Sequence, residues 1–456
     1  MEGAQGARSM ARALALAAGA CAVVLSAASA SAIDAAHKAK ADALAAKAES
    51  FLLAHQDKAT GGWSVPEAPK ADPGKPEAQA PSQPHMPGIT GLVLRGLVMN
   101  PKMSHDDLAI TSGVKYLLSH QQPDGGIYDR AAPAYNTSLA ISALSQIKQP
   151  YAQEAVKPAL KFLRHLQWGE EADGVVGGKE AAKPVTKDHP FYGGVGYGRS
   201  GRPDTSNLNM FMDALQDAGV PSTDPAVQRA LVFLSRTQML DEVNDMPYAD
   251  GSRQGGFVYS TAENAESIDK RAGQSQAGTM EETLSDGTTA SRLRAYGSMT
   301  YAGFKSYAYA KLDRDDVRVT SALGWIKSNY TVDENPGMGS EGQYYYYLTF
   351  SRALAAWGEA GFDVKVNEGV QRRDWANDLV DKLETLQEPD GQFRSVNKRW
   401  MEDNPVLITA YSLIALREAQ QSPLVAGAGA PLQTTQTRPG AKPAGDGPAK
   451  PAGGVH

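Results

Sequence analysis

The feature that most constrains the fold of this chain is a pair of helices that repeats along the sequence. In each pair an amphipathic, Leu-rich segment ends in Gln, a turn containing Gly follows, and a more apolar segment then begins. A helix that is apolar on most sides belongs inside a fold, whereas an amphipathic helix belongs at its outer side. The amphipathic segments end at Gln56, Gln121, Gln167, Gln238 and Gln387, and the fifth in chain order, around Trp325 and Ile326, lacks the Gln.

Six such pairs predict a closed ring. The apolar helices are expected to begin near Gly88, Asn136, Thr205, Ser298, Gln343 and Pro405. A repeat array that closes on itself hides the end faces that an open array must cap. We therefore expect an all-α fold, an (α/α)6 toroid of six outer and inner helix pairs.

The first 32 residues have the pattern of a secretory signal peptide. Arg8 and Arg12 precede an apolar run, and Ala30-Ser31-Ala32 has the small-x-small pattern of a cleavage site. We therefore expect an exported chain, periplasmic or extracellular; whether the signal is cleaved or kept as an anchor stays open.

Residues 33–422 are expected to form the toroid, with a Pro/Ala-rich loop at 65–84 inside the first repeat. The Pro/Gly/Ala-rich tail, 423–456, has too few apolar residues to bury a core and is expected to be disordered. Long loops at 168–203 and 239–295 follow outer helices and precede inner ones, so the inner-helix N-termini share a rim with these loops. Because loops on a rigid scaffold usually carry function, we expect this rim to be the functional face.

Composition excludes several classes of function. The formal net charge is -6 and no block of Lys and Arg occurs, so we expect no nucleic-acid partner. The one cysteine, Cys21, lies in the signal, which leaves no thiolate for chemistry or metal binding. We expect no metal and no cofactor. No amphipathic membrane-docking surface is found, although membrane association stays open, and the oligomeric state is not predicted.

The Gln-turn-Gly-aromatic units resemble degenerate QW repeats of squalene-hopene cyclases and of protein prenyltransferase β subunits. Across roughly 36–420, the stretches Arg294–Gly303 and Asp333–Gly339 and the run Tyr344–Tyr347 are similar to prenyltransferase/squalene oxidase repeat proteins of the secreted bacterial branch. The resemblance implies a terpenoid cyclase/protein prenyltransferase-like toroid. It also implies a zinc site in a prenyltransferase, and the missing cysteine speaks against that activity.

Two aspartates are candidates for the acid that the resemblance to a cyclase implies. Asp313-Arg314-Asp315-Asp316 matches the D-x-D-D pattern of squalene-hopene cyclases, but it opens an outer helix, where Asp caps free N–H groups. Asp204 begins the third inner helix at the functional rim and is the candidate catalytic residue. An N-cap role is open for Asp204 too, and the two roles are compatible.

Other residues at the inner-helix starts are candidate ligand contacts. Arg199 and Arg202 precede a helix N-terminus, where an anion such as a diphosphate or an acidic sugar is favoured. Aromatic faces stabilise a carbocation or stack on a sugar ring, although core packing explains the same tyrosines. The candidate ligand-binding residues are Asn136, Asn207, Arg199, Arg202, Tyr296, Tyr301, Tyr344 and Tyr345.

Three functions remain open. In the first, the chain binds an apolar or sugar ligand in a deep central cavity lined by the inner helices and acts as a terpenoid-cyclase-like enzyme. Alternatively it is a carbohydrate-active toroid, a lyase or glycosidase, which needs two carboxylates or a Tyr/Arg pair facing a cavity. The third is a non-catalytic binding or scaffold protein.

Overall fold

In the computed structural model the described residues are 33–66, 83–176, 179–198, 201–366, 369–421. The predicted signal, most of the loop 65–84 and the predicted tail lie outside them. The outer helices are α1 (Ala35–Ala54), α3 (Leu108–Ser119), α5 (Pro150–His165), α7 (Pro225–Thr237), α9 (Val317–Ser328) and α11 (Trp375–Leu386). The inner helices are α2 (Pro87–Val98), α4 (Pro133–Leu144), α6 (Thr205–Asp217), α8 (Gly297–Tyr309), α10 (Gln343–Trp357) and α12 (Pro405–Gln421).

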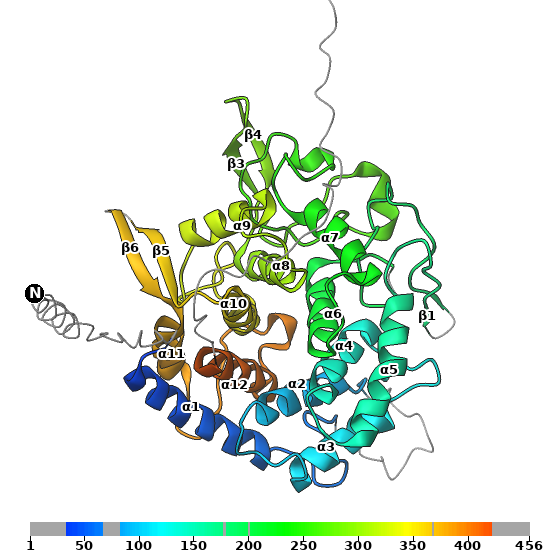
Figure 1. Cartoon of the computed structure of the whole chain (residues 1–456), viewed down its shortest axis with the longest axis vertical. Helices are drawn as coiled ribbons and strands as arrows, with labels where there is room; N and C mark the ends of the chain where they lie inside the picture. The colour runs from blue at the N-terminus through cyan, green and yellow to red at the C-terminus, as the bar shows by residue number, and fades with distance from the viewer. Residues whose placement is uncertain (1–32, 67–82, 177–178, 199–200, 367–368, 422–456) are drawn as a thin grey trace, which may run out of the picture. The chain divides into compact units, whose positions relative to one another are not determined.

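The inner helices contact one another in a closed sequence (Figure 1). Helix α2 packs on α4, and the contacts continue through α6, α8 and α10 to α12, which packs back on α2. Outer helices α3, α5, α7 and α9 pack on α2, α4, α6 and α8, while α1 and α11 both pack on α12. Inner helices are therefore covered on both sides, which explains why their sequences are apolar all round. None of the helices in the described part of the chain is long and apolar enough to cross a membrane.

The expectation of an all-α fold is wrong in one respect, because the described residues contain three antiparallel hairpins. They pair β1 (Val175–Val176) with β2 (Lys179–Glu180), β3 (Thr279–Thr283) with β4 (Thr289–Leu293) and β5 (Gly361–Val366) with β6 (Gly369–Asp374). A hairpin needs only a short local turn, so it fits inside a connection without disturbing the helix period. The third hairpin follows an inner helix, whereas the long loops 168–203 and 239–295 precede inner helices. Short 3-10 turns occur at Pro247–Ala249, Ala265–Lys270 and Arg399–Met401.

The repeated Gln joins each outer helix to the next. Gln238 at the end of α7 donates to the carbonyl oxygen of Gly255 in its own turn and to that of Arg318 in α9, both at 2.9 Å. Gln387 does the same with Gly391 and with Leu44 of α1, which ties the last outer helix to the first. The same two bonds recur at Gln56, Gln121 and Gln167.

The turn glycine of each repeat that carries the Gln lies against the backbone of the next outer helix. At Gly193, φ is +84°, and a Cβ atom would stand 1.8 Å from the carbonyl oxygen of Arg229. The turn then bonds to its own inner helix, as Phe257 N–H does to the Thr300 hydroxyl at 3.0 Å. Backbone N–H groups of three other turns donate in the same way to the hydroxyls of Thr90, Thr137 and Thr409.

The fifth repeat, which lacks the Gln, uses other residues to join α9 to α11. The hydroxyl of Tyr330 donates to the carboxylate of Asp378 at 2.7 Å, and Arg373 forms an ion pair with the same carboxylate at 2.8 Å. Arg373 lies in β6 next to its last residue, so this insertion takes the place of the missing Gln link.

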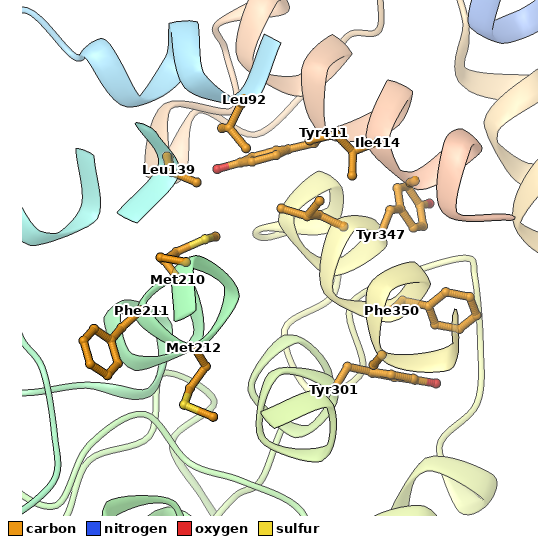
Figure 2. Close-up of a cluster of buried hydrophobic side chains, with 14 of the residues drawn as sticks. Leu92, Leu139, Met210, Phe211, Met212, Tyr301, Tyr347, Phe350, Tyr411 and Ile414 are labelled. Atoms are coloured by element: carbon orange, nitrogen blue, oxygen red, sulfur yellow. The ribbon is translucent and has the colours of Figure 1, made fainter. Parts of the chain in front are cut away.

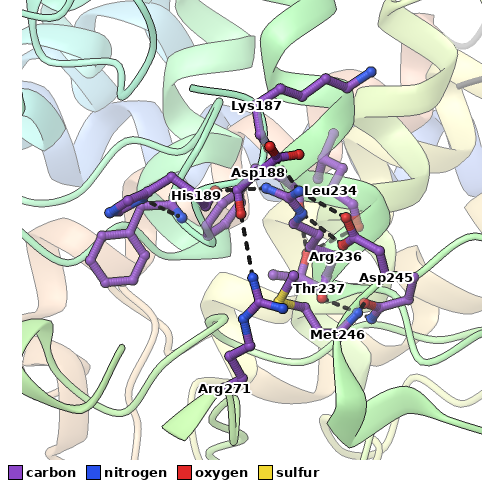
Figure 3. Close-up of polar contacts among 12 residues, drawn as sticks. Lys187, Asp188, His189, Leu234, Arg236, Thr237, Asp245, Met246 and Arg271 are labelled. Carbon is purple, nitrogen blue, oxygen red and sulfur yellow. Dashed lines mark hydrogen bonds and ion pairs between the residues drawn. The ribbon is translucent and has the colours of Figure 1, made fainter. Parts of the chain in front are cut away.

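The long loops of the rim are anchored by Arg236, a buried residue near the end of α7 (Figure 3). Its guanidinium donates to the carbonyl oxygens of Lys187 and His189 at 2.8 and 2.7 Å and pairs with Asp245 at 2.8 Å. One side chain thus ties the loop 168–203 to the loop 239–295. Trp168 stacks on His189 at 5.3 Å and extends this contact. Burial lowers the pKa of His189, and the charges of Lys183 and Arg236 add to the effect.

Candidate functional site

Asp204 is the N-cap of α6 and is fully buried. Its Oδ1 accepts hydrogen bonds from the Ser206 hydroxyl at 2.6 Å and from Asn207 N–H at 2.9 Å, and Oδ2 accepts from Asn207 Nδ2 at 2.9 Å. Burial raises the pKa of Asp204, while these bonds and the charge of Arg202 offset part of the rise. The capping role is therefore present in the structure.

Several tyrosine side chains lie near this carboxyl group. The charge of Asp204 acts on the pKa of four of them, which are Tyr135, Tyr197, Tyr259 and Tyr296. The rings of Tyr135 and Tyr197 stack at 6.1 Å, and the Tyr135 hydroxyl lies 3.4 Å from that of Tyr411. Tyr345 stands edge-on to Tyr411 at 6.2 Å and accepts a hydrogen bond from Asn209 at 3.1 Å. We call Asp204, Arg202 and these six tyrosines the rim cluster.

Arg202 lies beside the buried carboxyl at the edge of the rim cluster. Its guanidinium stands over the ring of Tyr259 at 5.1 Å and donates to Gln274 Oε1 and, at 3.4 Å, to the carbonyl oxygen of Ala262. Tyr197 is the most accessible member of the cluster, with 36% of its surface exposed. A ligand approaching the rim therefore meets Tyr197 and Arg202, with Asp204 beneath them.

The other predicted ligand residues divide into two groups. Asn207, Arg202, Tyr296 and Tyr345 lie in or against the rim cluster, as the preceding contacts show. Asn136 is buried, and its amide bonds the N–H of Gly88 and the carbonyl oxygens of Ala131 and Ala132. Arg199 lies outside the described residues.

Tyr301 and Tyr344 lie away from the cluster. Tyr301 packs between α8 and α10, with its ring 5.0 Å from that of Phe350 (Figure 2). The Tyr344 hydroxyl donates to the carbonyl oxygen of Arg394 at 2.7 Å, toward the turn after α11. Both positions are contacts between elements of the fold.

The D-x-D-D motif has the capping role expected from its position. Asp316 is the N-cap of α9 and accepts a hydrogen bond from Arg318 N–H at 2.9 Å. Asp313 and Asp315 are exposed on the outer side of the chain. A solvated carboxylate at an outer helix is not placed to protonate an apolar substrate.

Charged side chains from five inner helices meet nearer the C-terminal ends of these helices. Arg352 of α10 pairs with Asp213 at 2.9 Å and with Asp217 at 3.2 Å, both on α6. Lys305 of α8 pairs with Asp213 at 2.6 Å, and burial lowers the pKa of Lys305 to about 8. Arg95, Ser142 and Glu418 complete this group, which we call the central ion cluster.

The centre of the ring has little free space. Leu92, Leu139, Met210 and Ile414 point toward one another from α2, α4, α6 and α12 (Figure 2). The cavity that they line together with the central ion cluster has a volume of about 10 Å³, room for roughly one water molecule. The expected deep central cavity is therefore not found at this place, because opposing side chains and ion pairs meet across the axis.

Sequence reasoning missed Tyr135, Tyr197, Tyr259 and Tyr411. It also missed the central ion cluster, for which a signal was present. Asp213, Lys305 and Arg352 are charged residues inside segments that are otherwise buried, and a buried charge needs a partner. Within the described residues, no three His, Cys, Asp or Glu side chains are placed to hold a metal ion.

No protein-family model matches the chain, and no curated protein matches its sequence. Several solved structures are similar to it in fold. A protein from Actinoplanes is 15% identical, with a TM-score of 0.35 over 73% of this chain and 99% of that one. The type II terpene cyclase MstE from Scytonema, as a variant in complex with the product merosterolic acid A, is 13% identical, with a TM-score of 0.30 over 74% and 99%. Another variant, with the substrate geranylgeranyl dihydroxybenzoate, is 12% identical, with a TM-score of 0.29 over the same shares. These values are too low to carry an argument about this chain.

Proposed function

We propose that the chain is an exported α/α toroid of the terpenoid cyclase and protein prenyltransferase-like class that binds a small ligand at the rim cluster. The observation that carries the proposal is the convergence of a buried carboxyl, a half-buried arginine and six tyrosines, which come from four inner helices and the two long loops. Tyrosines supply flat apolar faces together with hydroxyl groups, a combination that suits a ligand with both apolar and polar parts.

The ligand is bound at the rim and not along the ring axis. A cavity of about 10 Å³ has no room for an isoprenoid chain, and the charges of Asp213 and Arg352 beside it disfavour one. Tyr197, Arg202 and Tyr345 are each partly exposed, so a molecule at the rim reaches them directly.

Ligand recovery tests the proposal. The full chain is purified from its expression host and extracted, and mass spectrometry identifies the small molecules that bind it. Tyr197→Ala is compared with Tyr151→Ala, because both tyrosines are 36% exposed and Tyr151 lies in the first turn of outer helix α5. We expect a compound that the native chain and Tyr151→Ala retain and that Tyr197→Ala loses. Equal retention by the two variants, or no compound at all, would refute the proposal.

Export is tested on the same material. Cell fractionation and N-terminal sequencing of the full chain should place it outside the cytoplasm with its first residue at Ile33. A chain that begins at Met1 in the cytoplasmic fraction contradicts this part of the proposal.

A second candidate function is acid catalysis on the bound ligand, and the raised pKa of Asp204 favours it. A raised pKa favours the protonated form of a carboxyl group, which is the form that a general acid needs. Asp204→Asn keeps a capping side chain, so it separates the two functions. If the site is catalytic, this variant retains the ligand and stops its conversion.

A further inference from the structure

The guanidinium of Arg202 has N–H groups that bond to no residue in the described part of the chain. In the described part of the chain no carboxylate lies within ion-pair distance of its guanidinium, and only Nη1 has hydrogen-bond partners. Gln274 and the ring of Tyr259 nevertheless hold the group in place. Ordering a long side chain on binding costs entropy. A guanidinium that is already fixed therefore binds an anion at a lower entropic cost.

A second guanidinium, that of Arg399, acts on the same part of the rim. It pairs with Glu341 and donates to Gln276 Oε1 at 2.7 Å. The charges of Arg202 and Arg399 both lower the pKa of Tyr296, which burial raises strongly. The glutamines that hold the two arginines, Gln274 and Gln276, are separated by one residue in the sequence, so a single segment holds both guanidinium groups.

Tyr296 offers a third donor. Its ring is buried at the N-terminus of α8, yet its hydroxyl has no hydrogen-bond partner among the residues that the structure describes. A hydroxyl without a partner is free to donate to an oxyanion. The negative charge of Asp204 opposes an anion here, and burial, by raising the pKa of Asp204, reduces that opposition.

The remaining surface of the rim cluster suits a hydroxylated ring. Tyr197 is exposed at the edge of the cluster and is backed by the ring of Tyr135, so its position is fixed. Tyrosine faces stack on sugar rings, and a tyrosine hydroxyl is able to bond a sugar hydroxyl as donor or acceptor.

We propose that the ligand of the rim cluster is an acidic saccharide whose carboxylate binds Arg202 and the Tyr296 hydroxyl. This inference rests on the proposed ligand-binding function and names its ligand class. Acidic and neutral parts of the ligand are recognised by different residues, so the two proposals fail separately.

The experiment measures the affinity of the full chain for trigalacturonate, for its methyl ester and for laurate by calorimetry. The ester keeps the rings and removes the charge, whereas laurate keeps a carboxylate and removes the rings. Arg202→Gln should weaken trigalacturonate binding by about tenfold to a hundredfold, the usual loss for a hydrogen-bonded charge. Arg202→Lys should restore only part of it, since a lysine lacks the planar fork. Arg372→Gln is the control, because Arg372 lies on the exposed hairpin strand β6.

The expected result is that trigalacturonate binds, that the ester binds at least tenfold more weakly, and that Arg372→Gln has no effect. Equal affinity for acid and ester, or an Arg202→Gln variant that binds like the native chain, would overturn the inference while leaving a ligand at the rim. Preference for laurate would overturn the saccharide class. Failure of trigalacturonate to bind, with a compound other than an acidic saccharide recovered by mass spectrometry, would overturn it as well. Circular dichroism of Arg202→Gln and Arg202→Lys guards against loss of fold, and a folded Arg202→Lys keeps the comparison valid.

Discussion

Replacing Gln238 by Leu tests whether the repeated Gln holds the ring together. The side chain is fully buried and makes three hydrogen bonds, to the carbonyl oxygens of Gly255 and Arg318 and from the Tyr307 hydroxyl, each at 2.9 Å. Leucine has nearly the same volume, so the substitution removes the bonds without opening a cavity. A buried polar group left without a partner costs about 1–3 kcal/mol, so the loss of three bonds is expected to cost roughly 3–5 kcal/mol.

This loss is large enough to measure. With an unfolding entropy of about 2.1 cal/mol/K per residue, roughly 390 residues give about 0.8 kcal/mol/K, so Tm should fall by about 4–6 °C. Urea unfolding followed by circular dichroism gives the change in free energy directly. Gln121→Leu should cost less, because the two bonds of Gln121, both 3.2 Å long, are only partly buried.

The control is Gln371→Leu, at an exposed position of the hairpin β5–β6. A surface change of this kind is expected to alter stability by less than about 0.5 kcal/mol. If Gln238→Leu is no less stable than Gln371→Leu, the links between outer helices contribute nothing, and the packing of the inner helices alone would have to explain closure.

Two further changes test the polar groups of the interior. Burial raises the pKa of Glu402 from 4.5 to about 7, so the folded chain binds more protons than the unfolded chain between these values, and stability should fall as pH rises through that window. Glu402→Gln should flatten this fall in urea titrations at pH 5 and pH 7.5, and an unchanged pH dependence would contradict the assignment. Arg352→Met removes a buried ion-pair partner that Asp213 and Asp217 share. The free energy of unfolding should fall by about 3–5 kcal/mol in the same assay. A loss below about 1 kcal/mol would show that the central ion cluster is not needed for stability.

The helix pairs were predictable because their signals are local. Asp204 and Asp316 both cap helices where the sequence placed helix starts, since a capping side chain bonds N–H groups only two or three residues ahead. The terminal Gln lies one or two residues past the end of five of the outer helices. The three hairpins were not predicted, because two strands of a few residues, joined by a short turn, leave little period in the sequence.

The composition of the rim cluster depends on the closed ring and is not visible locally. Tyr197 and Tyr259 lie in the two long loops, which Arg236 ties together, whereas Tyr135 and Tyr411 come from α4 and α12. A tyrosine in such a segment is as compatible with core packing as with a site. Tyr301 and Tyr344 illustrate this, since both resemble Tyr345 in sequence context and both pack between elements of the fold.

The central ion cluster and the rim cluster are connected through the helices that carry them. Arg352 follows Tyr345 by seven residues on α10, and Asp213 follows Asp204 by nine on α6, so the ion pair lies roughly 10–13 Å below the rim on both helices. Buried ion pairs are seldom more stabilising than well-packed apolar residues, so stability alone does not account for three carboxylates and three cations at the ring axis.

The geometry of these ion pairs offers an account of their presence. Helices α6 and α10 are separated in the ring by α8, and Lys305 of α8 pairs with the same Asp213, so the charges fix three inner helices relative to one another. Because Asp204, Tyr296 and Tyr345 stand at the N-terminal ends of these three helices, the central ion cluster sets the spacing of the groups that a ligand at the rim would contact.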